Sequence, residues 1–205
     1  MSTVGLDLAG VEGRPTGLCI LKGMNAETSV VYKDEEIINS IEISKPEVVA
    51  IDAPLSLPTG RKSIEQRTNV HLRECDKELL RRKIKFFPIT LGPMRKLTTR
   101  GISLRKSLES RHCKVMEVYP GGAQDVLGIP RKQRGLERLK AGLEKLGVKG
   151  LNDRISDHEL DAVTCAFVGR LFLRGGAVIY GTVDKAIIMP KGETHRKKLH
   201  SKSMI

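Results

Sequence analysis

The 205-residue chain contains no tryptophan, and three Tyr and four Phe are its only aromatic residues. A core poor in aromatic side chains must be built mainly from Val, Ile and Leu, and the hydrophobic share of 40% is enough for one. No apolar run approaches the roughly 20 residues of a membrane helix, and the N-terminus lacks the order of a signal peptide. We therefore expect a cytoplasmic protein without a membrane segment.

Paired cysteines are also lacking, since the four cysteines are far apart at Cys19, Cys75, Cys113 and Cys165. Zinc sites and redox dithiols need closely spaced pairs, so this pattern argues against both. We expect the cysteines to be reduced and mostly buried.

Acidic residues are scarce relative to basic ones, and the formal net charge is +12. The excess is uneven: −5 over residues 1–60, +11 over 61–114, +2 over 115–189 and +4 over 190–205. A basic segment beside an acidic framework attracts phosphate polyanions, which makes nucleic acid the expected partner. The alternative is that exposed Lys and Arg serve solubility or thermal stability. The oligomeric state is left open, a dimer included.

Alternating and helical apolar patterns predict an α/β order of elements. Strands are expected at 2–7, 17–22, 28–32, 48–51, 115–118, 177–180 and 186–189, and helices at 34–43, 134–146 and from 157 onward. Helical patches are expected at 73–83 and 94–110 within a basic, mainly helical insert spanning about 55–114. We predict one domain over 1–189 and a basic, flexible tail over 190–205.

Three acids stand out because each interrupts or ends an apolar strand: Asp7, Asp52 and Glu117. An unpaired buried charge is costly, so such acids need a purpose. If these strands share a sheet, the carboxylates can meet at one edge, where Mg²⁺ or Mn²⁺ would keep them ionised. One or two ions of this kind would support phosphodiester hydrolysis.

The last long helix adds Asp157 and Asp161, which share a helix face because they are four residues apart. Asp157 is also explained as a helix-start residue, whereas Asp161 lies past the first turn among apolar residues. His158 can be a metal ligand, a proton shuttle or a polar helix-start residue. The predicted metal ligands are Asp7, Asp52, Asp157 and Asp161, and the predicted catalytic residues are Asp7, Asp52, Glu117 and Asp161.

Four segments together resemble an uncharacterised family of predicted ribonuclease H-like nucleases: Gly5-Leu6-Asp7-Leu8-Ala9, Ile51-Asp52-Ala53-Pro54-Leu55, Glu117-Val118-Tyr119-Pro120 and Asp157-His158-Glu159-Leu160-Asp161-Ala162. The resemblance implies a ribonuclease H-like mixed sheet with an antiparallel first hairpin, flanking helices and a metal site at Asp7, Asp52 and Asp161. The pair His158 and Asp161 is similar to the final helix motif of some resolvases. Glu117 departs from the best-known ribonucleases, which leaves the number of metal ions open.

The first functional hypothesis is a metal-dependent nuclease for structured or hybrid nucleic acid. The arginines expected to grip phosphates are Arg73, Arg81, Arg82 and Arg100. An actin-like or sugar-kinase-like phosphotransferase is the second, although the turn after Asp7 lacks a phosphate-cradling Gly- and Thr-rich loop. The third is a non-catalytic nucleic-acid-binding or scaffold protein.

Overall fold

The computed structural model describes residues 1–192, which form a seven-stranded mixed sheet in the order β3-β2-β1-β4-β5-β7-β6. The strands are β1 (Ser2–Asp7), β2 (Thr16–Lys22), β3 (Asn25–Val31), β4 (Val48–Asp52), β5 (Val115–Val118), β6 (Ala177–Tyr180) and β7 (Ile187–Pro190). The hairpin β1-β2-β3 is antiparallel, β1, β4, β5 and β7 run parallel, and β6 returns antiparallel to β7. The predicted mixed sheet with an antiparallel first hairpin is confirmed.

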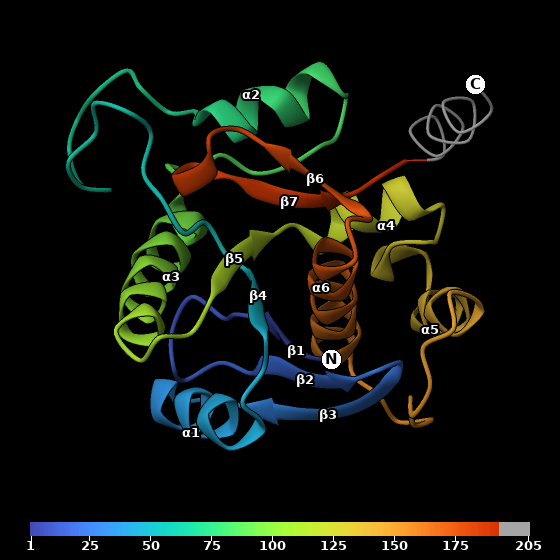
Figure 1. Cartoon of the computed structure of the whole chain (residues 1–205). Coiled ribbons are helices and arrows are strands. Elements are labelled where there is room, and N and C mark those ends of the chain that lie inside the picture. Colours follow the sequence, from blue (N-terminus) through green and yellow to red (C-terminus); the bar gives the residue numbers. More distant parts are fainter. Residues whose placement is uncertain (193–205) are drawn as a thin grey trace, which may run out of the picture.

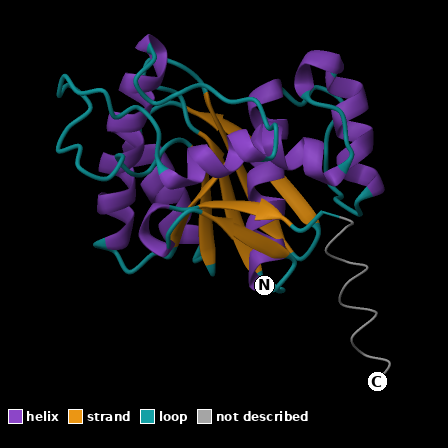
Figure 2. Ribbon diagram, turned by 90° about the horizontal axis from the view of Figure 1, so that it is seen from above, coloured by secondary structure: helices purple, strands orange, loops and turns teal. Residues whose placement is uncertain are grey.

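Helices cover both faces of the sheet, which gives three layers (Figures 1 and 2). The α-helices are α1 (Asp34–Ser44), α2 (Glu74–Arg81), α3 (Gly92–Glu109), α4 (Pro120–Leu127), α5 (Leu136–Lys145) and α6 (Asp157–Leu173), and the 3-10 turns are η1 (Lys132–Arg134) and η2 (Val183–Lys185). One core joins α1 and α3 to the sheet through residues such as Ile37, Leu104 and Ile51. The other face carries α6, against which α4 and α5 pack.

The central helix α6 is buried along most of its length, because the sheet covers one side and other helices cover the rest. Two glycines allow its close approach. A Cβ on Gly5 of β1 would lie 2.0 Å from the Ala162 carbonyl oxygen, and one on Gly17 of β2 would lie 2.1 Å from that of His158. These backbone contacts place the first turns of α6 over Gly5 of β1 and Gly17 of β2. They decide where the side chains of the first turn lie.

The region between β4 and β5 corrects one prediction. Helix α3 packs on the sheet as the crossover helix between these parallel strands, so it is a flanking helix of the core. Residues 53–91 contain a single α-helix, the eight-residue α2, and are otherwise mainly loop. The protruding part is therefore shorter and less helical than the predicted insert over 55–114.

Helix α4 was not predicted, because Tyr119-Pro120-Gly121-Gly122 has the composition of a strand-ending turn. Proline is nevertheless well suited to the first helical position, and α4 begins at Pro120. Gly122 allows the helix to pack tightly, since a Cβ there would lie 2.7 Å from the Tyr119 ring and 3.0 Å from Ile84. Tertiary packing thus favours a helix over the local turn preference.

No helix within residues 1–192 combines the length and apolar character needed to cross a bilayer. All four cysteines are free thiols, and three of them are buried. Most of the predicted tail lies outside the described residues, and Pro190, its first residue, ends β7.

Candidate active site

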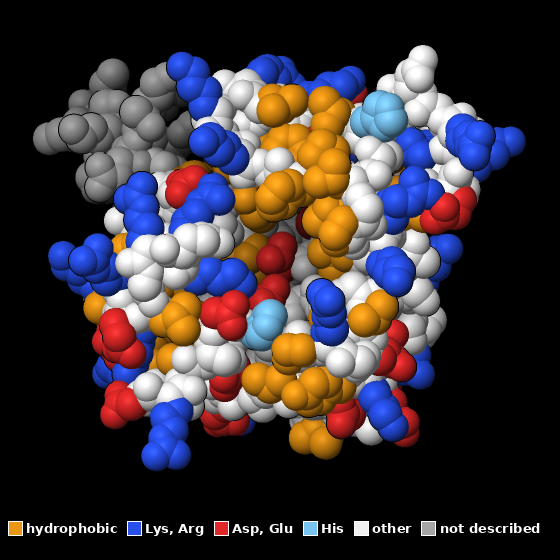
Figure 3. Space-filling view, turned by 180° about the vertical axis from the view of Figure 1, so that it is seen from behind, with side chains coloured by type: hydrophobic (Ala, Val, Ile, Leu, Met, Phe, Trp, Pro, Cys, Tyr) orange, Lys and Arg blue, Asp and Glu red, His pale blue; other side chains and the backbone are white. Residues whose placement is uncertain are grey.

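The candidate site lies where β1 and β4 end and α6 begins. Asp7 and Asp52 are the last residues of their strands and are paired directly in the parallel register. Helix α6 contributes His158, whose Nδ1 lies 2.8 Å from Asp7 Oδ2. Figure 3 shows acidic side chains at the bottom of a hollow on this face, with a histidine and basic side chains around it. Residues from three distant parts of the chain therefore meet in one place.

A lysine that the sequence did not single out lies among these acids. Lys132 Nζ, from η1, is 2.8 Å from Asp161 Oδ2 and 3.1 Å from Asp157 Oδ2. Its distance to Asp7 Oδ2 is 4.0 Å. Lys132 is only partly exposed, and although its partial burial favours the neutral amine, these carboxylates hold its pKa above the usual range. The ammonium thus neutralises the point on which the aspartates converge.

Electrostatics show that the acids are crowded. Burial and the neighbouring Asp7 carboxylate raise the pKa of Asp52 well above its ordinary value. Burial also raises the pKa of Asp161, against the opposing effect of Lys132. A Gln124 side-chain amide from α4 donates a 2.8 Å hydrogen bond to Asp161 Oδ1 and fixes its orientation. Crowded, partly desolvated carboxylates of this kind are stabilised by a nearby cation.

Glu117 lies in a different cluster from the aspartates. Its carboxylate accepts two hydrogen bonds from the Arg73 guanidinium, at 2.7 and 2.8 Å, and one from the Leu55 backbone N–H at 2.8 Å. Arg73 also pairs with Asp76 at 2.8 Å, and all three charged side chains are buried. The Glu117 oxygens are therefore occupied by Arg73 and the backbone, and the predicted catalytic role of Glu117 stays a prediction.

Two of the four arginines predicted to grip phosphates are engaged inside the protein. Arg73 is buried between two carboxylates, and Arg100 is buried with its guanidinium donating to Asp34 and to two backbone carbonyls. Neither is free to bind a phosphate. Arg81 and Arg82 are exposed, although both pair with Glu78 at 3.0 and 2.7 Å. Their predicted role stays a prediction.

Basic side chains instead gather in a neighbouring hollow of about 670 Å³. Its basic lining residues are Lys83, Lys85, Arg131, Arg134 and Arg138, accompanied by one acid, Asp125. The hollow adjoins the aspartates through η1, since Lys132 points to the acids while Arg131 and Arg134 line the hollow. Sequence reasoning missed it because Arg134 and Arg138 belong to the basic helix predicted at 134–146, and no local pattern brings Lys83 and Lys85 beside them.

The chemistry of the donors fits a hard divalent cation, because aspartate oxygens are the ligands that Mg²⁺ and Mn²⁺ prefer. Within residues 1–192, no three His, Cys, Asp or Glu side chains already stand at metal-binding distances from one another. The Lys132 ammonium fills the point of convergence. A divalent cation bound there would neutralise the aspartate carboxylates in place of Lys132.

Comparison with known proteins places the chain in a family without an assigned activity. Residues 5–185 match the family described as "Protein of unknown function (DUF429)". The chain belongs to this family. The matched residues include Asp7, Asp52 and Asp161, so the candidate site lies inside the region that defines the DUF429 family. No match was found among the curated proteins.

Two solved structures are similar to this DUF429 protein. Thermus thermophilus RuvC in complex with a Holliday junction substrate is 15% identical, with a TM-score of 0.52 over 86% of this chain and 97% of that one. A second Thermus thermophilus RuvC structure is 16% identical, with a TM-score of 0.49 over 92% of this chain and all of that one. The first likeness shows that the fold is ribonuclease H-like, as predicted.

Proposed function

We propose that this DUF429 protein is a divalent-metal-dependent nuclease whose active centre is formed by Asp7, Asp52, Asp157 and Asp161. The observation that carries the proposal is the convergence of carboxylates from β1, β4 and α6 beside an open basic hollow. The acidic and basic side chains have different roles at such a site. The acids hold metal, and the cations hold the phosphates of the substrate.

The other residues have roles that follow from their contacts. Mg²⁺ or Mn²⁺, when bound, would supply an activated water and stabilise charge on the phosphate oxygens. His158, which is hydrogen-bonded to Asp7, would orient that carboxylate and accept or deliver a proton at the edge of the acidic hollow. Lys83, Lys85 and Arg134 would align the nucleic-acid backbone. The likeness to RuvC, which was solved with a junction substrate, supports nucleic acid as the substrate class.

The test is a cleavage assay on labelled single-stranded, duplex, RNA/DNA hybrid and four-way-junction substrates, with Mg²⁺, with Mn²⁺ and with chelator. Asp7→Asn and Asp161→Asn should each lower metal-dependent cleavage by at least about 100-fold, because each removes a charged metal ligand while keeping the side-chain shape. Asp153→Asn is the matched control, since this aspartate is fully exposed and pairs with Lys140. Cleavage that survives in chelator, or in both site variants, would contradict the proposal.

Lys132 favours a second candidate, a nucleic-acid-binding protein that does not cleave. Its ammonium already neutralises Asp157 and Asp161, so the acids have a partner without metal. This candidate predicts tight binding to the same substrates with no metal-stimulated product in any of them. The cleavage assay distinguishes the two, provided that binding is measured in parallel.

A further inference from the structure

An apolar pocket of about 180 Å³ opens beside the candidate active site. Asp52 and the two residues that follow it form one wall, residues of α2 and α3 form others, and aromatic side chains complete it. The lining residues are Asp52, Ala53, Pro54, Arg73, Asp76, Leu79, Phe86, Phe87, Met94, Leu97, Glu117, Val118, Tyr119 and Ile187. Since Asp52 belongs to both, the pocket and the proposed active centre share a boundary.

Aromatic side chains are concentrated here in a chain that has few. Three of its seven aromatic residues, Phe86, Phe87 and Tyr119, line this one pocket. Phe87 is 69% exposed, so its ring is accessible to a ligand from solution. Figure 3 shows an apolar strip on the face that carries the acidic hollow, and the strip runs to the edge of that hollow.

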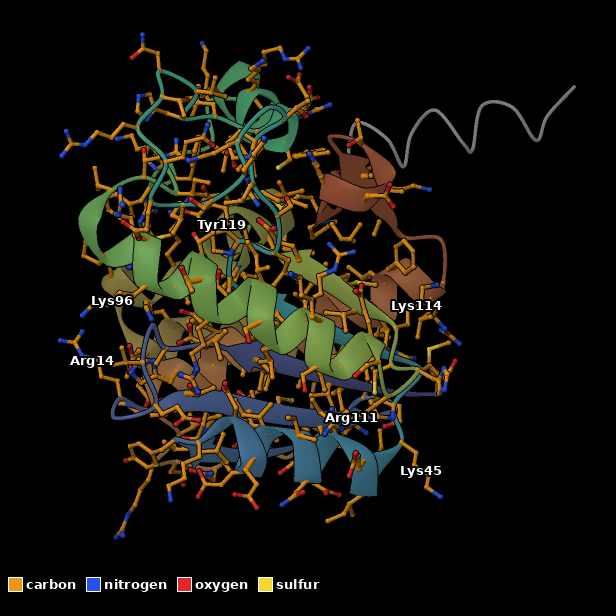
Figure 4. All side chains as sticks on the ribbon, turned by 90° about the vertical axis from the view of Figure 1, so that its left-hand side faces the viewer. Arg14, Lys45, Lys96, Arg111, Lys114 and Tyr119 are labelled. Atoms are coloured by element: carbon orange, nitrogen blue, oxygen red, sulfur yellow. The ribbon has the colours of Figure 1, made fainter. Side chains whose placement is uncertain are left out.

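The Tyr119 side of the pocket is held in place by side-chain contacts. The Tyr119 hydroxyl donates a 2.6 Å hydrogen bond to the Lys85 carbonyl, and the Arg131 guanidinium lies 5.7 Å from the Tyr119 ring centre. Figure 4 shows Tyr119 beside the N-terminal half of α3, below the segment that carries α2. A Cβ on Gly101 would lie 2.9 Å from the Pro54 carbonyl oxygen, so α3 is fixed closely against this wall.

Apart from Asp52 at the boundary, the charged lining residues are paired with one another. The guanidinium of Arg73 is shared by Glu117 and Asp76, and this group offers no unpaired ion to a ligand. The volume is below the roughly 300 to 1,000 Å³ of pockets for drug-sized ligands, so it suits one group about the size of an aromatic ring system. A small apolar pocket with aromatic lining next to a basic hollow matches a nucleotide, with its base in the pocket and its phosphates toward the cations.

We propose that this pocket receives one unpaired nucleobase of the substrate, adjacent to the phosphate at the aspartates. The proposal rests on the proposed nuclease function and specifies its substrate: a strand with an unpaired nucleotide at the cleavage point, as in a bulge, a flap or a junction. Stacking of a base on aromatic rings is favourable for any base. A paired base must first leave the helix, which costs free energy that an unpaired base does not spend.

Two hairpin duplexes that differ only by one bulged nucleotide test the proposal, with 2-aminopurine at the bulge and chelator present. We expect about tenfold tighter binding of the bulged hairpin and quenching of the 2-aminopurine fluorescence, as stacking on Phe86, Phe87 or Tyr119 requires. Phe87→Ala should remove this preference, and Phe87→Trp should retain it. Tyr32→Ala is the matched control, because Tyr32 is an exposed aromatic residue that does not line the pocket.

The outcomes separate the two proposals. Equal affinity for both hairpins, or a preference that Phe87→Ala leaves unchanged, overturns the base pocket even if metal-dependent cleavage is found. A preference that depends on Phe87 without cleavage of any substrate supports the pocket and contradicts the nuclease function. Failure to bind either hairpin overturns the pocket as well. Thermal melting of Phe87→Ala shows that the fold is intact, as expected for so exposed a side chain.

Discussion

Two clusters of acids lie near one edge of the sheet, and they differ in the cation that neutralises them. In the first, Glu117 and Asp76 share the Arg73 guanidinium, and all three side chains are at most 6% exposed. In the second, the aspartates surround Lys132, which is 27% exposed, while Asp157 is 41% exposed. The first cluster is closed to solvent and the second is open.

The difference in cation matters as much as the difference in burial. Arginine holds Glu117 through two parallel hydrogen bonds of fixed geometry, which suits a permanent structural pair. Lysine is a point charge on a flexible stem, and it can leave without breaking a bidentate pair. The closed arginine cluster stabilises the segment 53–91 against the sheet. In the open lysine cluster, another cation can replace Lys132 beside the acids.

The largest effect is expected from opening the closed cluster. Arg73→Met should lower the free energy of unfolding by about 3 to 5 kcal/mol, because it leaves Glu117 and Asp76 buried without a counter-charge. Urea unfolding measures this. Arg105→Met is the matched control: its i,i+4 pair with Glu109 is on the surface and should be worth about 0.5 kcal/mol or less. If Arg73→Met were as stable as Arg105→Met, the closed cluster would have no structural role.

A smaller effect is expected from removing the cation of the open cluster. Lys132→Met should lower the melting temperature in chelator, because Asp157 and Asp161 then repel each other and Asp7 unscreened. Added Mg²⁺ should restore it, so that the Mg²⁺-induced rise in melting temperature is larger in the variant than in the natural chain. In chelator, the substitution should lower the free energy of unfolding by about 1 to 2 kcal/mol, since the contacts of Lys132 with Asp157 and Asp161 are only partly buried.

Lys140→Met is the control for Lys132→Met, because Lys140 pairs with Asp153 at 2.7 Å outside the site. Mg²⁺ should have no larger effect on this variant than on the natural chain. An equal Mg²⁺ response in all three proteins would show that Lys132 does not occupy a cation site.

The sequence was sufficient to predict the sheet and the aspartates, because both depend on local pattern. Asp7 and Asp52 end apolar strands, and Asp161 interrupts an apolar helix face, so each is visible without tertiary information. Their convergence follows once β1 and β4 are placed side by side as parallel strands. The ribonuclease H-like order of elements then puts the start of α6 against them.

The rest of the site depends on contacts that no local pattern encodes. Lys132 lies in the polar run Arg131-Lys132-Gln133-Arg134, where each residue is typical of a solvated surface. The partner of Glu117 is 44 positions away in the chain, and only the path of the loop after β4 brings Arg73 to it. Gln124 was missed with its helix α4. A pattern shows which acids are unusual, but it does not show which cation neutralises them.

The smallest effect concerns the pH dependence of the open cluster. The hydrogen bond to Asp7 raises the pKa of His158 above its ordinary value, against partial desolvation. A raised pKa in the folded state stabilises the protein below the unfolded value of about 6.5, and this contribution is lost as the pH rises through the folded value. In chelator, His158→Gln should therefore be less stable than the natural chain at about pH 5.5, and the difference should shrink by about pH 8.5. For a partly exposed pair, this difference in the free energy of unfolding should stay below about 1 kcal/mol.

Urea unfolding at both pH values measures the difference. The same substitution made on an Asp7→Asn background should show no such pH-dependent loss, because the hydrogen-bond partner that raises the pKa has been neutralised. A loss of equal size on both backgrounds would mean that His158 senses some group other than Asp7.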